Sequence, residues 1–131
     1  MVRIKMITSD TKTLFLFPGQ GAQYPGMGLD LLEKGGAAVR ELFAAASETM
    51  GRDMAALLAG ADDASLKRSD ISQPAITLVN LAAAAFLGER GIKPAACAGF
   101  SLGEYAALVT AGIVTAEDCF RLVKVRGQAM Q

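Results

Sequence analysis

The stretch AGFSLGEY, residues 98–105, contains the pattern Gly-x-Ser-x-Gly centred on Ser101. A short apolar run, 94–98, precedes it, and an apolar pattern with helical spacing, 105–111, follows it. A strand, this pattern and a helix in succession are typical of a nucleophile elbow, a tight turn that lifts a serine hydroxyl clear of the backbone. Both glycines are needed because a Cβ beside so tight a turn would collide with the neighbouring strand or helix. The stretch therefore predicts Ser101 as a nucleophile and the amide of Leu102, at a helix N-terminus, as a donor to an oxyanion. A capping serine in a glycine-rich turn is the alternative interpretation.

Length and composition restrict the class of protein. The 131 residues suit one small domain, and 52% hydrophobic residues are enough for a packed core. Thirteen basic and thirteen acidic residues give a net charge of zero, so binding to nucleic acid through phosphate neutralisation is not expected. Cys97 and Cys119 lie in apolar surroundings, which favours buried free thiols in a reducing compartment over a disulfide. The sequence shows no apolar run of transmembrane length, and Met1–Met6 is too short for a signal peptide. We therefore expect a cytoplasmic protein with no membrane partner.

The sequence contains no histidine. A serine hydroxyl is a poor nucleophile until a base takes its proton, and histidine is the usual base near neutral pH. Either Ser101 is not a nucleophile, or its base lies on a part of the protein outside this chain.

A second strand and a glycine-rich loop are predicted near the start of the chain. Residues 11–17, TKTLFLF, are apolar on both faces, as in a buried parallel strand. The loop at 18–28 lacks the Gly-Lys-Ser/Thr ending of a P-loop, and no acidic residue stands at the spacing of a ribose ligand. We expect instead that backbone N–H groups of this loop approach an anion, with Gln20 at its tip.

The remaining segments predict helices. Helical spacing of apolar residues places helices over 27–32, 37–50, 54–58 and 116–131, with a polar surface loop over 61–70. The longest helix is expected to be capped by Ser72, to carry Pro74 in its first turn and to run to about Arg90. The residues predicted to face inward are Val39, Leu42, Phe43 and Ala46 in the 37–50 helix, Ala75, Leu78, Val79, Ala82, Ala83 and Phe86 in the longest helix, and Cys119, Leu122, Val123 and Val125 in the last.

Two polar residues on these helices have two interpretations each. Gln73 is either a solvated residue of a first turn or a side chain that points into the same cleft as Ser101. Arg126 is either a solvated charge near a helix C-terminus or a fixed, bidentate carboxylate binder to which the adjacent Gly127 leaves open access.

Four blocks of sequence, in this order along the chain, carry a family resemblance. They are FPGQGAQ at 17–23, SQPA at 72–75, GFSLGEYAAL at 99–108 and RGQAM at 126–130. Together they resemble the N-terminal part of the malonyl-CoA:acyl carrier protein transacylases, the acyltransferases of fatty acid and polyketide synthesis. The resemblance covers nearly the whole chain from about Thr13. It implies an α/β fold, an α/β-hydrolase-like parallel sheet with helices on both faces. It also implies that residues 1–131 are the N-terminal portion of a single acyltransferase domain, without that family's ferredoxin-like subdomain and with the catalytic histidine beyond Gln131.

The resemblance also implies roles for individual residues. Ser101 would take the acyl group from CoA as an ester, and the amides of Gln20 and Leu102 would form the oxyanion hole. Arg126 would pair with the free carboxylate of a malonyl group, and Gln73 would line the pocket. The acyl group would then pass to the phosphopantetheine thiol of acyl carrier protein. No metal or cofactor is implied, since the CoA thioester is a substrate.

One residue departs from the family pattern, and three functions stay open. Phe100 stands where the family usually has a histidine that is not the general base, so we expect altered packing near the turn. The first function is a malonyl-selective acyltransferase whose partner is the C-terminal part of the same protein. The second is a serine hydrolase or thioesterase on a related scaffold, and the third is a non-catalytic domain. Arg126 and the Gln20 loop favour the first, because a hydrolase has no need to hold a carboxylate.

Overall fold

The computed structural model describes residues 12–131, in which two parallel strands pack with helices. This confirms the predicted α/β class. The elements in chain order are β1 (Leu14–Phe17), α1 (Leu29–Lys34), α2 (Ala37–Met50), α3 (Met54–Gly60), α4 (Asp63–Leu66), α5 (Ser69–Gly88), β2 (Ala96–Gly99), α6 (Gly103–Thr110) and α7 (Ala116–Ala129). The Met1–Met6 segment and Thr11, the first residue of the predicted strand, lie outside the described residues.

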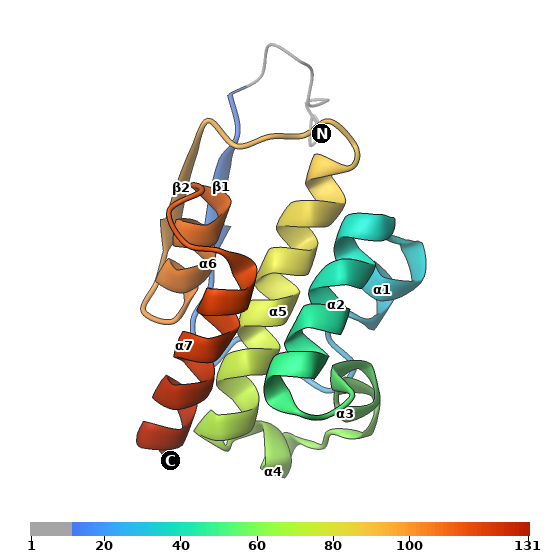
Figure 1. Ribbon diagram of the computed structural model, residues 1–131, viewed down its shortest axis with the longest axis vertical. Coiled ribbons are helices and arrows are strands. Elements are labelled where there is room, and N and C mark those ends of the chain that lie inside the picture. The colour runs from blue at the N-terminus through green and yellow to red at the C-terminus, as the bar shows by residue number, and fades with distance from the viewer. Residues whose placement is uncertain (1–11) are drawn as a thin grey trace, which may run out of the picture.

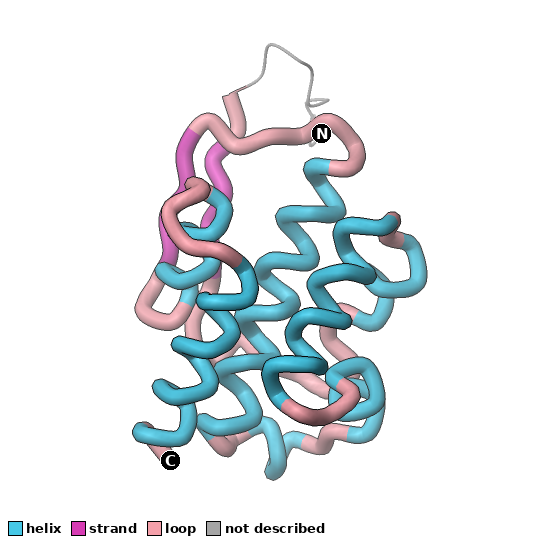
Figure 2. The backbone as a smooth tube through the Cα atoms, in the orientation of Figure 1, coloured by secondary structure: helices cyan, strands magenta, loops and turns pink. Residues whose placement is uncertain are grey.

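The two strands form a small parallel sheet on one side of the molecule (Figure 2). Leu14 is paired with Ala96 and Phe17 with Gly99, so both strands end at the same edge. Phe15 and Phe17 are buried and meet edge to face, with ring centroids 6.3 Å apart. Their neighbours on the opposite face, Leu14 and Leu16, are 54% and 69% exposed. The prediction of a strand buried on both faces is therefore wrong for one face, which no described helix covers.

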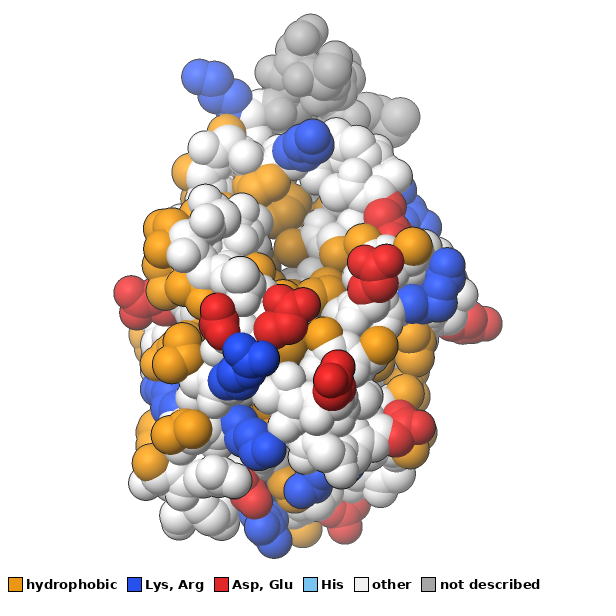
Figure 3. Space-filling view, in the orientation of Figure 1, with side chains coloured by type: hydrophobic (Ala, Val, Ile, Leu, Met, Phe, Trp, Pro, Cys, Tyr) orange, Lys and Arg blue, Asp and Glu red, His pale blue; other side chains and the backbone are white. Residues whose placement is uncertain are grey.

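An apolar groove runs beside β1. It has a volume of about 380 Å³ and lies between β1 and the C-terminal half of α5, where Ala83, Ala84 and Leu87 contribute to its wall. Hydrophobic side chains line this groove, and Figure 3 shows a hollow with hydrophobic side chains in the upper part of the view. Parallel strands with an unpaired edge and an uncovered apolar face are rare in complete α/β domains.

Helix α5 is the centre of the fold, with α2 packed on one side and α7 on the other (Figure 1). Ala75, Leu78 and Ala82 are fully buried, as predicted, whereas Val79, Ala83 and Phe86 are half-buried. Within residues 12–131, α5 alone is long and apolar enough to cross a membrane by length and composition. Its burial among other helices is the usual situation of a core helix, so this property is weak evidence of a membrane span.

The segment predicted as a loop, 61–70, is instead largely helical. Asp62 caps α4 by accepting a hydrogen bond from the Ser65 amide at 2.8 Å, while the Ser65 hydroxyl accepts one from the Asp62 amide at 3.1 Å. This is a capping box, which stabilises a helix start even in a polar sequence.

Helix α5 begins at Ser69 rather than at the predicted cap, Ser72. The Ser72 amide donates to the carbonyl of Arg68 at 2.8 Å, so the helical hydrogen bonds start one turn earlier. Pro74 is consequently the sixth helical residue and lies beyond the first turn. The Ser72 side chain is fully buried, and its hydroxyl has no hydrogen-bond partner. The prediction was wrong because the pattern Ser-x-Pro resembles a helix start, although helical pairing also extends upstream of it.

The last helix confirms only half of its predicted buried face. Cys119 and Val123 are fully buried, but Leu122 and Val125 are 51% and 65% exposed. At 3.6 residues per turn, a helix that buries positions 119, 120, 123 and 127 directs positions 122 and 125 to the other side.

Both cysteines are free thiols, and only one is fully buried. Cys97 is half-buried in β2, which corrects the prediction of two buried thiols. Burial raises the pKa of the Cys119 thiol from its ordinary value of 9.0 to about 11.

This pKa shift predicts a pH-dependent stability. The folded protein favours the neutral thiol, so Cys119 contributes stability that is complete below pH 9 and is lost as pH rises toward 11. We expect the melting temperature of the wild-type protein to fall more steeply between these pH values than that of Cys119→Ala. Other groups titrate equally in both proteins, so their contributions cancel in the comparison. Equal slopes of melting temperature against pH would contradict the raised pKa of Cys119.

Candidate active site

Ser101 lies on a tight turn between β2 and α6. Its φ is 50°, and within the described range it is the one non-glycine residue in the left-handed region. The Phe100 amide donates to the carbonyl of Phe17 at 3.0 Å, and the amide of Gly103 donates to the carbonyl of Phe100 at 2.9 Å. The first contact ties the turn to β1 and the second closes it. Such a backbone costs a residue with a side chain about 1–2 kcal/mol. Ser101 is exposed, so the turn presents its side chain at the surface.

The two glycines of the turn are sterically required. A Cβ on Gly99 would overlap the backbone of Gly103 and Glu104, and a Cβ on Gly103 would overlap the carbonyl group of Phe17. Because these contacts are with backbone, no side-chain rotation could relieve them. The structure therefore confirms the strand–turn–helix context and the role predicted for both glycines.

The glycine-rich loop touches this turn. A Cβ on Gly19 would lie 2.6 Å from the carbonyl oxygen of Phe100 and 3.6 Å from the Leu102 nitrogen. The side chain of Asn80, on α5, donates to the carbonyl of Pro18 at 3.0 Å and holds the start of the loop. Among residues 12–131, no acceptor is hydrogen-bonded to the amides of Gln20 or Leu102. Both amides are thus unbonded in this range, and Leu102 itself is buried, with 1% of its surface exposed.

Four polar side chains, which we call the amide network, connect this loop to α5 and α7. Arg126 Nη1 donates to Gln73 Oε1 at 2.7 Å, Gln73 Nε2 donates to Gln20 Oε1 at 3.2 Å, and Gln20 Nε2 donates to the Ser69 hydroxyl at 3.2 Å. Gln73 is fully buried, and its Nε2 also lies 3.4 Å from the sulfur of Met130. The network joins three residues that the sequence singled out. Ser69 was missed, because it fell in the segment expected to be a loop and carries no motif of its own.

Arg126 keeps hydrogen-bonding capacity for a further partner. Arg126 is half-buried as a residue, and its guanidinium carbon lies 5.9 Å from the centre of the Tyr105 ring. The ion pairs of the part described are Arg68–Asp70 and Asp118–Arg121, neither of which involves Arg126. A guanidinium has five N–H donors, so those not used by Gln73 could bind a planar carboxylate.

Gly127 explains how Arg126 reaches the network. A Cβ at this position would lie 2.8 Å from the carbonyl oxygen of Ser69, so a side chain would separate α7 from α5. The close approach brings the guanidinium within reach of Gln73 on the facing helix.

Phe100, the departure from the family pattern, is 77% exposed. A Cβ on Gly19 would lie 3.5 Å from its ring, so the ring stands beside the loop at the surface. The altered packing expected at this position therefore concerns the outside of the turn.

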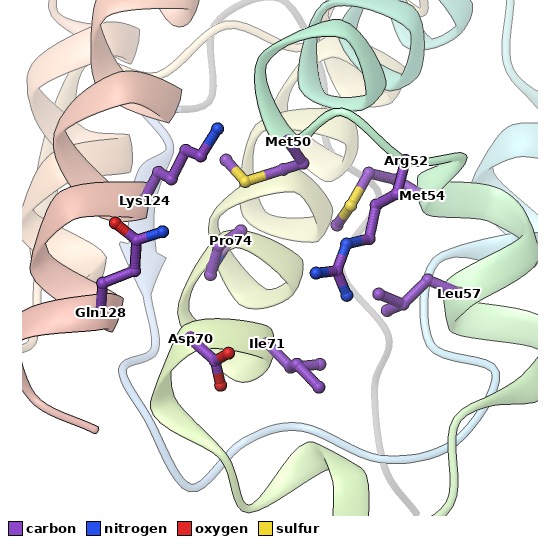
Figure 4. Close-up of a pocket in the computed structure, with 9 residues that line it drawn as sticks. All are labelled: Met50, Arg52, Met54, Leu57, Asp70, Ile71, Pro74, Lys124 and Gln128. Carbon is purple, nitrogen blue, oxygen red and sulfur yellow. The ribbon is translucent and has the colours of Figure 1, made fainter.

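A separate cavity of about 50 Å³ lies between α2, α3, α5 and α7 (Figure 4). Arg52 and Asp70 line it, whereas Ser101, Gln20 and Arg126 do not. The Arg68 side chain, bonded to both carboxylate oxygens of Asp70, lowers the pKa of that carboxyl group. The volume suits one or two water molecules rather than an acyl group, so this cavity is not the substrate site. In the described range, no three His, Cys, Asp or Glu side chains are grouped as metal ligands.

Comparison with known proteins identifies the family and the fold of this chain. Residues 14–131 match the family described as the acyl transferase domain. The malonyl CoA-acyl carrier protein transacylase of Bacillus subtilis is 42% identical over 120 residues, which are 92% of this chain and 38% of that protein. The crystal structure of an acyl carrier protein S-malonyltransferase from Vibrio cholerae superimposes with a TM-score of 0.84 at 41% identity, over 92% of this chain and 40% of that one.

A third similar structure contains a carrier protein. It is PlMCAT:AntF, a type II polyketide synthase acyl-carrier protein in complex with its malonyl-transacylase, with a TM-score of 0.83 at 38% identity, covering 92% of this chain and 39% of that one. The chain therefore spans about two fifths of the length of the relatives it matches. It has the fold of the corresponding part of those enzymes and belongs to the acyl transferase domain family.

Proposed function

We propose that this chain is the N-terminal portion of a malonyl-CoA:acyl carrier protein transacylase of fatty acid or polyketide synthesis. The observation that carries the proposal is the amide network, which links the Gln20 loop at the Ser101 turn to the guanidinium of Arg126. In this proposal, the network connects the loop assigned to the oxyanion hole with the arginine assigned to the carboxylate, and the loop lies beside the turn of the assigned nucleophile. The names of the relatives support the same activity.

In the proposed reaction, the turn acts as a nucleophile elbow. Ser101 Oγ loses its proton to a base and attacks the thioester carbonyl carbon, and the resulting oxyanion accepts hydrogen bonds from the amides of Gln20 and Leu102. The carbon–sulfur bond then breaks, CoA leaves as a protonated thiol, and the acyl group remains as an ester on Ser101. The phosphopantetheine thiol of carrier protein attacks this ester in turn and releases the serine. No metal or cofactor is needed, because the thioester already carries the activated acyl group.

Selection of malonyl over acetyl would depend on Arg126. The malonyl carboxylate can accept two parallel hydrogen bonds from the guanidinium. An acetyl group would leave that charge desolvated and without a partner, and sites built to bond a polar group reject analogues that lack it. The same argument disfavours a hydrolase or a non-catalytic domain, for which a half-buried arginine held by a buried amide has no use.

The general base would be supplied by a segment outside this chain. The chain has no histidine and spans about two fifths of its relatives. The uncovered face at Leu14 and Leu16 and the groove beside β1 support the same conclusion, because further strands and helices of one domain would cover them. We also propose that the protein is located in the cytoplasm, where CoA thioesters are used.

The test is the mass of the acyl-enzyme. We expect the complete protein that carries this chain, incubated with malonyl-CoA, to gain about 86 Da on Ser101, the mass of a malonyl group held as an ester. A transacylase accumulates this ester until carrier protein is added, whereas a hydrolase releases free malonate. Release of malonate without carrier protein, or an unmodified serine, would overturn the proposal.

A further inference from the structure

The amide network can be hydrogen-bonded in only one direction. The guanidinium of Arg126 can only donate, so Gln73 must present its Oε1 to Arg126. Its Nε2 then faces Oε1 of Gln20, and Nε2 of Gln20 faces the hydroxyl of Ser69. The orientation of both amides is therefore fixed by the charged group at one end.

Gln73 is the residue through which the two ends are connected. Its side chain is fully buried, and both ends of its amide are bonded, one to α7 and one to the loop. Rotating the amide would place its NH₂ group against the guanidinium, donor against donor, and would leave Gln20 without its bond. Because Gln73 is fully buried, the role we assign to it is to orient its neighbours, in place of the pocket-lining role that the resemblance implied.

We propose that Gln73 is a positioning residue that couples the carboxylate binder Arg126 to the oxyanion loop at Gln20. This inference rests on the proposed function, which assigns those two roles. A carboxylate bound by Arg126 restrains the guanidinium, and Gln73 transmits that restraint to the loop. A carboxylated acyl group would therefore bind more tightly and also react faster. An acetyl group, which has no carboxylate, would have neither advantage.

Two variants of Gln73 in the complete protein test this coupling. Gln73→Met removes both hydrogen bonds at similar size. We expect it to lower kcat/KM for malonyl-CoA about tenfold, with part of the loss in kcat, and to lower that for acetyl-CoA much less. Gln73→Glu keeps an acceptor for Arg126 but neutralises its charge and removes the donor to Gln20. Here we expect a loss of about a hundredfold with malonyl-CoA, in both KM and kcat, and only a few-fold loss with acetyl-CoA.

Ser72→Ala is the matched control. It alters the adjacent fully buried residue of the same helix, whose hydroxyl has no hydrogen bond to lose, so the malonyl-to-acetyl ratio should not change. If Gln73 had a purely structural role, its variants would lower the melting temperature and both activities together, with an unchanged ratio, and the coupling would be refuted. The shape of Gln73→Glu matches the wild type, so this variant decides the question if Gln73→Met does not fold. A wild-type protein without malonyl transfer would refute the proposed function instead.

Discussion

Replacing Ser101 with alanine is expected to abolish the malonyl ester and to lower malonyl transfer by at least about a thousandfold, because removal of a nucleophile leaves only binding and oxyanion stabilisation. The loss should be in kcat, since neither Arg126 nor the Gln20 loop is altered. Mass spectrometry of the intact protein after malonyl-CoA treatment, together with transfer to carrier protein, measures both effects. An ester that persists in the alanine variant would assign the nucleophile to another residue.

Ser101→Gly provides the control for folding. The wild-type φ of 50° is a strained conformation for any residue with a Cβ and an unstrained one for glycine. The glycine variant should therefore be as inactive as the alanine variant, yet more stable than it by about 1 kcal/mol. Two variants that are equally inactive but differ in stability would show that the loss of activity does not result from misfolding.

Replacing Arg126 with methionine is expected to reverse the proposed preference for malonyl-CoA over acetyl-CoA. The carboxylate would lose both of its hydrogen bonds, and we expect kcat/KM for malonyl-CoA to fall about a hundredfold or more, roughly 3 kcal/mol. Acetyl-CoA should react as well as before or better, because no unpaired charge remains in the pocket. Arg126→Lys keeps the charge but not the planar fork, so it should recover only part of the activity. The measurement is the ratio of the two kcat/KM values.

Arg121→Met is the matched control on the same helix. Arg121 is exposed and pairs with Asp118 at 2.8 Å on the surface, where an ion pair contributes little. Its removal should leave both activities as in the wild type. If the two arginine variants lose malonyl transfer equally, the assignment of Arg126 is wrong.

The turn and the strand–helix order could be predicted from the sequence because a short motif marks them. Gly99 is dictated by contacts with residues close in the chain, and Gly103 by a contact with Phe17 in the adjacent strand, but both glycines belong to the one Gly-x-Ser-x-Gly pattern. The capping box of α4 was also local, since Asp62 and Ser65 stand three residues apart, but the polar composition of 61–70 obscured it.

The amide network could not be predicted in the same way. Its bonds join residues 49 to 53 positions apart, and their geometry depends on where α5, α7 and the loop meet. Sequence blocks indicated Gln20, Gln73 and Arg126 separately, whereas Ser69 belongs to no block. The exposure of Leu14 and Leu16 was unpredictable for another reason, because the burial of a strand depends on what lies against it and not on its own residues.

The contact between Gly127 and Ser69 has a consequence for how substrate range can change. The spacing of α5 and α7 at this point is set by a residue with no side chain. A single added methyl group there would meet the backbone of α5 and force the two helices apart. If Arg126 binds the acyl carboxylate as proposed, mutations that enlarge this inter-helical distance would change acyl preference without altering any chemical group at the site.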